Sequence, residues 1–180
     1  MTDALDHFSR VIQALSVVPR EPLSQIVEML KQARAERKKI FVFGNGGSAA
    51  NAAHIVNDLL KSTVQPNLPR MRVICLNDNI PALTAYANDI GYDAIFAEPL
   101  AALADAGDVV IALSGSGNSP NVLRALETAR QLGLTRIGLT GSRGKLKERC
   151  DVCVCVPSDS VQVIEDVHLI ALHSVFLALC

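Results

Sequence analysis

The stretch KIFVFGNGGSAANAAHIVNDLLK, residues 39–61, joins a short apolar run to a glycine-rich turn and then to a segment of helical length. Four further apolar runs, rich in β-branched residues, follow along the chain, and segments of helical length separate them. This alternation predicts an α/β fold with a parallel sheet that is covered by helices on both faces. The five predicted strands are residues 40–43, 73–76, 109–113, 137–139 and 152–156.

Helical patterns flank these strands at both ends of the chain. Residues 1–37 predict two helices, because apolar side chains recur at helical spacing on either side of a proline-containing break. Pro22 suits the first turn of the second helix, and residues 161–179 predict a last helix. No repeat or long linker divides the chain, so we expect a single domain over residues 1–180, with the sheet and its covering helices in residues 38–180.

The composition argues against several classes of function. With 180 residues, 49% of them apolar, the chain can bury a sizeable core. A net charge of −1 argues against broad electrostatic binding of nucleic acid or acidic membranes, and an aromatic content of 4% argues against stacking on single strands. No apolar run approaches the ~20 residues of a membrane span, and the N-terminus lacks a signal-peptide pattern. We therefore expect a cytoplasmic protein without nucleic-acid or membrane partners.

The cysteines give a weaker indication. Their number is odd and their spacing uneven, and two of them alternate with valines as residues of a strand do. This pattern favours buried thiols in a reducing compartment. A metal cluster is the alternative, although no CxxC pair has a second pair to match it. The five are Cys75, Cys150, Cys153, Cys155 and Cys180.

Two loops that follow predicted strands carry groups able to bind an anion. Gly44–Ser48 (GNGGS) is either a tight turn or a ligand loop, and Ser48 can cap the next helix or face an anion at its N-terminus. It matches neither GxGxxG nor a P-loop. The loop Ser114–Pro120 (SGSGNSP) brings hydroxyls to a helix start, with Ser119 as the expected N-cap and Pro120 as the first helical residue. Such loops hold phosphate without a lysine, and both lie where parallel sheets bind ligands.

A third loop leaves two interpretations open. Asn77-Asp78-Asn79 follows the second predicted strand, and Asn88-Asp89 comes shortly after it. These side chains can hydrogen-bond sugar hydroxyls. They can equally cap helices and form turns.

Three of the four histidines lie on predicted helices beside this candidate site. His54 and Asp58 are four residues apart and share a helix face. Glu165 and His173 are eight residues apart, about 80° around the last helix, and can converge on one site, whereas His168 points elsewhere. Two histidines and two carboxylates can hold Zn²⁺ or another divalent ion, or move a proton between adjacent carbons. The alternative is a local hydrogen bond for each histidine.

Four segments together resemble the SIS (sugar isomerase) domain family. They occur in the order and context of that family, and the resemblance covers nearly the whole chain. Within the family the chain is most similar to the phosphoheptose isomerase group. The segments are GNGGSAANAAHIVNDL, NDNIPALTAYANDIGYDAIF, ALSGSGNSPNV and VIEDVHLIALH.

This resemblance implies a flavodoxin-like three-layer αβα sandwich with a five-stranded parallel sheet and two N-terminal helices. It also implies a homotetramer with active sites between subunits. The implied reaction converts sedoheptulose 7-phosphate to D-glycero-D-manno-heptose 7-phosphate, a step towards the heptose of lipopolysaccharide. The implied substrate is thus a phosphorylated sugar.

The resemblance also implies roles for individual residues. Asp58 matches the family's base and His173 its acid/base histidine. A zinc ion, where one is bound, would be held by His54, Asp58, Glu165 and His173. The implied substrate-binding residues are Asn45, Gly46, Gly47, Ser48, Asp78, Ser114, Gly115, Ser116, Asn118, Ser119 and Glu165.

The chain departs from the family pattern at four places. Asp58 stands where the family has Glu, so its carboxylate is one methylene shorter. Glu165 replaces a Gln and adds a negative charge that should favour a cation. The sequence Lys61-Ser62-Thr63 stands where the family has an Arg, and Gly115 replaces a common hydroxyl residue.

We expect isomerisation through an enediol, with Asp58 removing the proton beside the carbonyl and His173 handling a second proton. One alternative is a non-catalytic sugar-phosphate-binding protein that resembles the DnaA initiator-associating protein, whose matching positions lack catalytic side chains. Another is an isomerase of a different phosphosugar. A sugar-phosphate-sensing regulator is disfavoured, because no DNA-binding helix pair or basic arm is evident.

Overall fold

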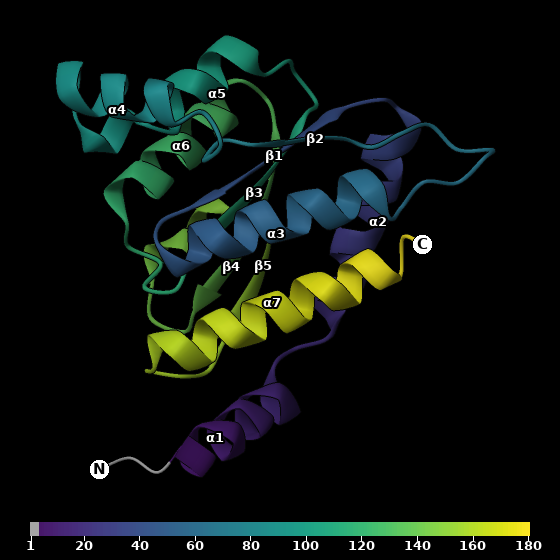
Figure 1. The fold of residues 1–180 in the computed structure, drawn as a ribbon, viewed down its shortest axis with the longest axis vertical. Coiled ribbons are helices and arrows are strands. Elements are labelled where there is room, and N and C mark those ends of the chain that lie inside the picture. The colour runs from purple at the N-terminus through teal and green to yellow at the C-terminus, as the bar shows by residue number, and fades with distance from the viewer. Residues whose placement is uncertain (1–3) are drawn as a thin grey trace.

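The computed structural model describes residues 4–180, and it contains all five predicted strands, both N-terminal helices and the last helix (Figure 1). Within this range no helix is long and apolar enough to cross a membrane. In chain order the elements are α1 (Ala4–Val17), α2 (Glu21–Ala35), β1 (Lys39–Gly44), α3 (Gly47–Lys61), β2 (Arg72–Cys75), α4 (Ile80–Asp89), η1 (Tyr92–Ala94), α5 (Ala97–Leu103), β3 (Val109–Ser114), α6 (Pro120–Gln131), β4 (Thr135–Gly141), η2 (Lys145–Arg149), β5 (Val152–Val156) and α7 (Val161–Leu177), where η marks a 3-10 helix.

The described strands form one parallel sheet in the order β2-β1-β3-β4-β5. Strands β2 and β5 are therefore its edges. At the carboxyl end of the sheet Gly44 of β1 lies opposite Leu113 of β3. The glycine loop after β1 and the serine loop after β3 are consequently neighbours, as the prediction of a joint site requires.

Helices cover both faces of the sheet, which confirms the three-layer αβα architecture (Figure 1). Alternate residues of a strand point to opposite faces, and β1 shows this clearly. Val42 packs with α2, α3 and α7 on one face, whereas Phe41 and Phe43 pack with α5 and α6 on the other. The fully buried phenylalanines, Phe43 and Phe96, lie with ring centroids 5.0 Å apart.

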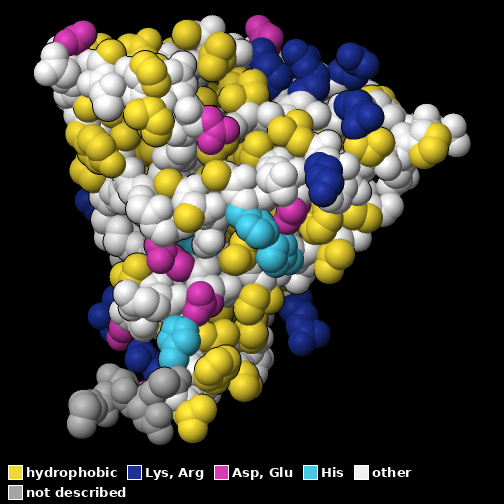
Figure 2. Space-filling view, in the orientation of Figure 1, with side chains coloured by type: hydrophobic (Ala, Val, Ile, Leu, Met, Phe, Trp, Pro, Cys, Tyr) yellow, Lys and Arg dark blue, Asp and Glu magenta, His cyan; other side chains and the backbone are white. Residues whose placement is uncertain are grey.

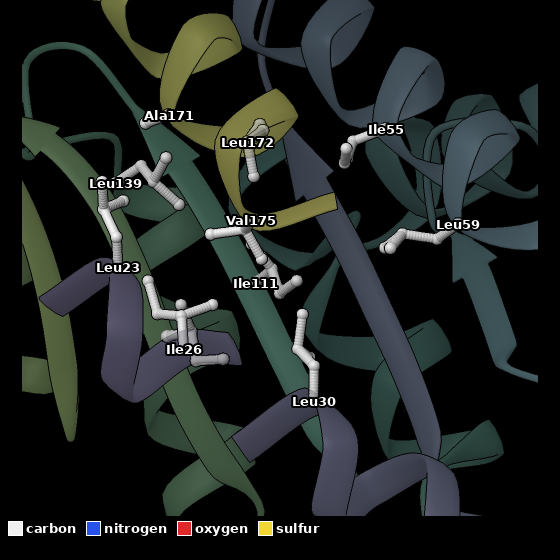
Figure 3. Close-up of a pocket in the computed structure, with 11 residues that line it drawn as sticks. Leu23, Ile26, Leu30, Ile55, Leu59, Ile111, Leu139, Ala171, Leu172 and Val175 are labelled. Carbon is white, nitrogen blue, oxygen red and sulfur yellow. The ribbon is translucent and has the colours of Figure 1, made fainter. Parts of the chain in front are cut away.

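The core between the sheet and helices α2, α3 and α7 is closely filled (Figure 3). The cavity there measures about 10 Å³ and is lined by apolar side chains alone. A space of that size holds at most one water molecule, and apolar walls give a water nothing to bond. This region therefore serves packing and is not a ligand site.

Helix α1 lies outside the three layers and contacts α7 (Figure 1). Ala14 of α1 is buried against Val163 and Val167 of α7. His7 of α1, for which only a local hydrogen bond is expected, bonds the Asp166 carboxylate of α7 at 2.6 Å. The imidazole thus serves the contact between these two helices.

Candidate active site

The glycine loop turns the chain sharply from β1 into α3. Helix α3 begins at Gly47, and Gly46 precedes it with a positive φ of 55°, which glycine adopts without strain. Ser48 is therefore already inside the first helical turn, and it is buried. The predicted capping role of Ser48 is wrong, because the N-cap is Gly46, two residues earlier than expected. Its position at the helix N-terminus still suits an anion.

An amide pair that the sequence argument missed holds this loop in place. Asn45 and Asn121, at the start of α6, exchange two hydrogen bonds of 2.9 and 2.8 Å. The Tyr92 hydroxyl donates a further bond to Asn45 at 3.1 Å. On the other side Asn77 accepts from the Gly44 amide and donates to the Gly44 carbonyl. The loop is therefore preorganised.

The serine loop after β3 converges its hydroxyls on one point. Ser114 Oγ lies 3.1 Å from Ser119 Oγ and 3.5 Å from Ser116 Oγ, and it accepts a bond from the Gly117 amide. Gly117 has a positive φ of 64°, and a Cβ there would lie 2.5 Å from Thr140 Oγ1, so this position requires glycine.

The start of α6 agrees with expectation in all but one respect. Pro120 is the first helical residue and Ser119 occupies the N-cap position, but the Ser119 hydroxyl makes no capping bond. It faces Ser114 instead. Asn118 donates its side-chain amide to the Ser116 carbonyl, and so it braces the loop.

The third loop serves mainly as structure. Asn79 caps α4 by accepting a bond from the Ala82 amide, and Asn77 braces Gly44. Asp78 lies exposed between them. The capping interpretation therefore holds for Asn79, whereas Asn77 bonds the glycine loop.

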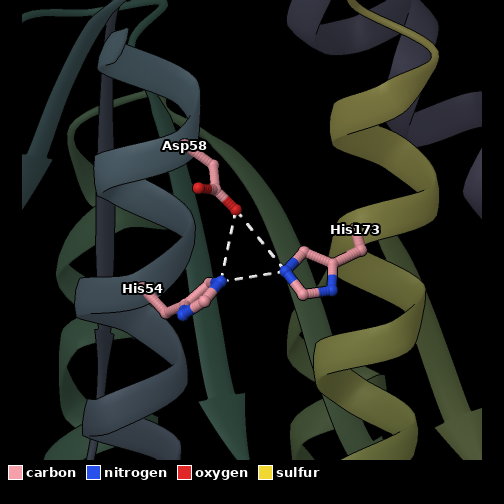
Figure 4. Close-up of side chains that lie close together, drawn as sticks. All are labelled: His54, Asp58 and His173. Carbon is pink, nitrogen blue, oxygen red and sulfur yellow. Dashed lines mark hydrogen bonds and ion pairs between the residues drawn. The ribbon is translucent and has the colours of Figure 1, made fainter. Parts of the chain in front are cut away.

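Helices α3 and α7 bring His54, Asp58 and His173 together (Figure 4). The two imidazole Nε2 atoms are 2.9 Å apart, and Asp58 Oδ2 lies 3.3 Å from that of His54 and 3.5 Å from that of His173. The histidine side chains are 47% and 39% exposed, whereas the carboxylate is 17% exposed. Figure 2 shows histidines at the open surface where these helices run side by side. We call these three residues the histidine cluster.

Glu165, the fourth predicted ligand, does not reach the histidine cluster in this chain. Its carboxylate lies at the start of α3, where a Cβ on Gly47 would come within 2.6 Å of both oxygens. Eight residues separate Glu165 from His173, which is about 12 Å along the helix axis. This rise along the axis, and not the angle around it, separates the two side chains. The N-terminus of α3 favours the negative charge that Glu165 places there.

The donors of the histidine cluster fit a zinc ion. Two imidazole nitrogens and one carboxylate oxygen are a common catalytic zinc set, and ligands bound at ~2.1 Å in a tetrahedron lie roughly 3.4 Å apart. The observed separations of 2.9–3.5 Å are close to this value. The two imidazoles also hydrogen-bond each other, and each lies at ion-pair distance from Asp58.

His168 stands apart from His173, the other histidine of α7, as expected. It is fully buried, and neither ring nitrogen has a hydrogen-bond partner among residues 4–180. Burial lowers the pKa of His168 to about 4, an effect that the nearby backbone of Thr140 partly offsets. The imidazole is therefore neutral at pH 7.

The comparisons with known proteins agree with this geometry. The chain is a SIS domain protein, because the model of the SIS domain matches residues 5–141. The phosphoheptose isomerase of Bordetella avium is 42% identical over 176 residues, which cover 96% of this chain and 87% of that protein. The chain belongs to the phosphoheptose isomerase family of SIS domain proteins.

Solved structures lead to the same family. A phosphoheptose isomerase from Neisseria gonorrhoeae superposes with a TM-score of 0.88 at 32% identity, covering 97% of this chain and 95% of that one. The corresponding enzyme from Francisella tularensis gives a TM-score of 0.87 at 29% identity and covers 97% and 93%. The SIS fold expected from the sequence is confirmed.

Proposed function

We propose that this protein interconverts sedoheptulose 7-phosphate and D-glycero-D-manno-heptose 7-phosphate through an enediol. The observation that carries this proposal is the meeting of His54, Asp58 and His173 on helices that start beside the anion-binding loops. Proton transfer between adjacent carbons needs a base and an acid within reach of one substrate. The relatives in the phosphoheptose isomerase family support the choice of a heptose.

The two loops anchor the phosphate. Ser48, with the hydroxyls of Ser114, Ser116 and Ser119, offers donors around the N-termini of α3 and α6. Ser48 and His54 are six residues apart on α3, which is roughly 9 Å along the axis. An extended phosphosugar spans a distance of that order. Binding energy at the phosphate can therefore position the carbonyl end for reaction.

The histidine cluster transfers the protons. Asp58 takes the C1 proton of the ketose, and the electron pair moves to form the enediol. His173 carries a proton between the two oxygens, and the proton held by Asp58 returns to C2 to give the aldose. No atom is gained or lost in this cycle, as isomerisation requires.

A zinc ion at this site would be held by His54, Asp58 and His173. When bound, it supplies a Lewis acid beside the carbonyl oxygens. Asp58 cannot freely be both a tight ligand and a base, so these two roles compete.

We further propose that the working unit is a homotetramer of one-domain chains, with sites between subunits. Phe8 and Ile12, both 67% exposed, give α1 an apolar outer face away from α7, and hydrophobic side chains are visible over α1 in Figure 2. Exposed apolar surface of this kind marks association. Sedimentation of the wild type and of a Phe8→Asp, Ile12→Asp double variant tests it. A wild type that sediments as a monomer would reject it.

The activity is tested by incubating the purified protein with sedoheptulose 7-phosphate, with and without Zn²⁺, and following the aldose product. Product formation is the expected result. Binding of the sugar phosphate without turnover would instead support the non-catalytic binding protein. Turnover of a different phosphosugar in preference to the heptose would change the substrate assignment.

A further inference from the structure

Three of the five cysteines gather at one edge of the sheet. Cys153 and Cys155 lie in the edge strand β5, and Cys150 precedes it in the sequence CDVCVC. All three are free, half-buried thiols. Because Cys153 and Cys155 alternate with the buried residues Val152, Val154 and Val156, their side chains share one face of the strand.

The three sulfur atoms form a row with Cys153 in its centre. Cys153 Sγ lies 3.9 Å from Cys155 Sγ. On its other side, Cys150 Sγ and Cys153 Sγ both lie over Gly138, which pairs with Cys153 in the sheet. They are 2.6 and 3.1 Å from the point that a Cβ on Gly138 would occupy. Because Gly138 has no side chain, the sulfurs of Cys150 and Cys153 can both occupy the space above it.

The separation of 3.9 Å distinguishes between two uses of neighbouring thiols. A disulfide requires an S–S distance of about 2.05 Å, so Cys153 and Cys155 are far from forming one. Two thiolates bound to the same ion at ~2.3 Å lie roughly 3.8 Å apart at a tetrahedral angle and roughly 4.6 Å apart in a linear arrangement. The Cys155 thiol donates a hydrogen bond to Cys153 across this distance, and the same spacing lets one ion replace the proton between the two sulfurs.

The surroundings favour a soft cation. Cys150 and Cys153 pack against the apolar cluster that includes the fully buried Leu146. This cluster lies on the sheet face covered by α5 and α6, opposite the face that α3 and α7 cover. Sulfur donors in an apolar setting select ions such as Cu(I) over hard oxygen-seeking cations. The site is thus separate from the histidine cluster.

We propose that Cys150, Cys153 and Cys155 form a binding site for one thiophilic cation, with Cu(I) as its representative. The ion takes two thiolate ligands, Cys153 and one of its two neighbours. Each thiol that binds gives up its proton to solvent, and the sulfur keeps the electron pair that it shares with the metal. No electron is transferred and no oxidant is needed.

Proton release makes the binding depend on pH. Binding therefore competes with protons throughout the neutral range and strengthens as pH rises. The Lys147 charge favours the thiolates of Cys153 and Cys155.

The test titrates the reduced full-length protein with Cu(I) under anaerobic conditions, against a chromogenic Cu(I) chelator. The His173→Ala background removes competition from the histidine cluster. We expect one tightly bound Cu(I) per chain and only sulfur neighbours in the X-ray absorption spectrum. Cys153→Ser should lose this copper, and Cys150→Ser and Cys155→Ser should each weaken its binding.

Cys180→Ser is the matched control, because it removes an exposed thiol outside the row. It should bind Cu(I) as the parent does. Thermal unfolding of every variant shows whether the fold is kept, and Cys155→Ser guards against failure of Cys153→Ser to fold. Equal binding by parent and cysteine variants, or nitrogen neighbours around the copper, would overturn the proposal. Neither result bears on the isomerase activity.

Discussion

The serine loop and the histidine cluster are built in different ways. The serine loop comes from one short segment, in which Ser114 bonds partners three and five residues away. It is held by its own hydroxyls and by Gly117. The histidine cluster joins His54 and His173, which are 119 residues apart, on two helices, and its histidines are half-exposed.

This difference indicates that the serine loop and the histidine cluster carry different parts of the proposed function. A preorganised loop binds a phosphate at little cost in ordering, because its donors already converge. An open cluster can change protonation state and admit a substrate, and it leaves room for groups from a neighbouring subunit. Binding should therefore depend on the loop, and turnover on the cluster. The predictions below test that division, beginning with the largest effect.

Replacing His173 with alanine should stop turnover and spare binding. General acid–base groups contribute ~10²–10⁴ in rate, so we expect kcat to fall roughly 10³-fold, about 4 kcal/mol. Inhibition by inorganic phosphate should stay within about twofold, since the serine loop is untouched. Steady-state kinetics with phosphate as a competitor measures both. A His173→Ala enzyme with normal kcat would show that turnover does not depend on the histidine cluster.

His168 lies on the same helix as His173, but we expect it to affect the stability of the fold and not turnover. The unfolded chain takes up a proton near the usual pKa of 6.5, whereas folded His168 stays neutral down to about 4. Its contribution to the free energy of unfolding is therefore complete above pH 6.5 and falls by about 3 kcal/mol between pH 6.5 and 4. A His168→Leu variant should lose this part of the pH dependence, because it has no imidazole to protonate.

Denaturant unfolding of both proteins at several pH values measures this effect. The difference between the two curves removes the contribution of other titrating groups. Parallel curves from pH 7 to 4 would show that His168 is protonated in the folded state. Burial would then not keep His168 neutral, and His168 would not differ in this respect from the histidines of the open cluster.

The parts of the molecule that could be predicted from the sequence are those that depend on local segments. The parts that could not be predicted depend on contacts between distant residues. The five strands and the serine loop could be predicted, because apolar runs and turn residues act locally. The pair His54 and Asp58 follows from helical spacing. The place of Glu165 could not be predicted by angle alone, since the rise along α7 carries it to Gly47. The bonds of Asn121 to Asn45 join residues 76 apart, and the only local signal was an amide just after Pro120.

Removing the central hydroxyl of the serine loop should weaken binding more than turnover. Ser114→Ala leaves Ser119 Oγ and the Gly117 amide without their common partner. A hydrogen bond to a charged group contributes roughly 1.5–3 kcal/mol, so KM and the phosphate inhibition constant should rise about 10- to 100-fold. Ser174→Ala, which removes an exposed hydroxyl bonded within α7, is the control. A loss of kcat at unchanged KM would contradict a role in anchoring.

The smallest effect is expected for Asp58→Glu, which lengthens the side chain by one methylene. The carboxylate then moves towards two Nε2 atoms that are already 3.3 and 3.5 Å away, but the half-exposed imidazoles can shift to admit it. We expect kcat at saturating Zn²⁺ to fall by less than about tenfold, under 1.4 kcal/mol. Asp58→Asn keeps the shape of the side chain and removes the base, so it should lose far more of kcat.

Measuring zinc affinity beside kcat separates the two roles of Asp58. If Asp58 acts mainly as a ligand, its replacement changes the zinc affinity more than kcat. If Asp58 acts mainly as the base, its replacement changes kcat alone. An Asn variant as active as the Glu variant would exclude Asp58 as the base and shift the proton transfer to the histidines alone.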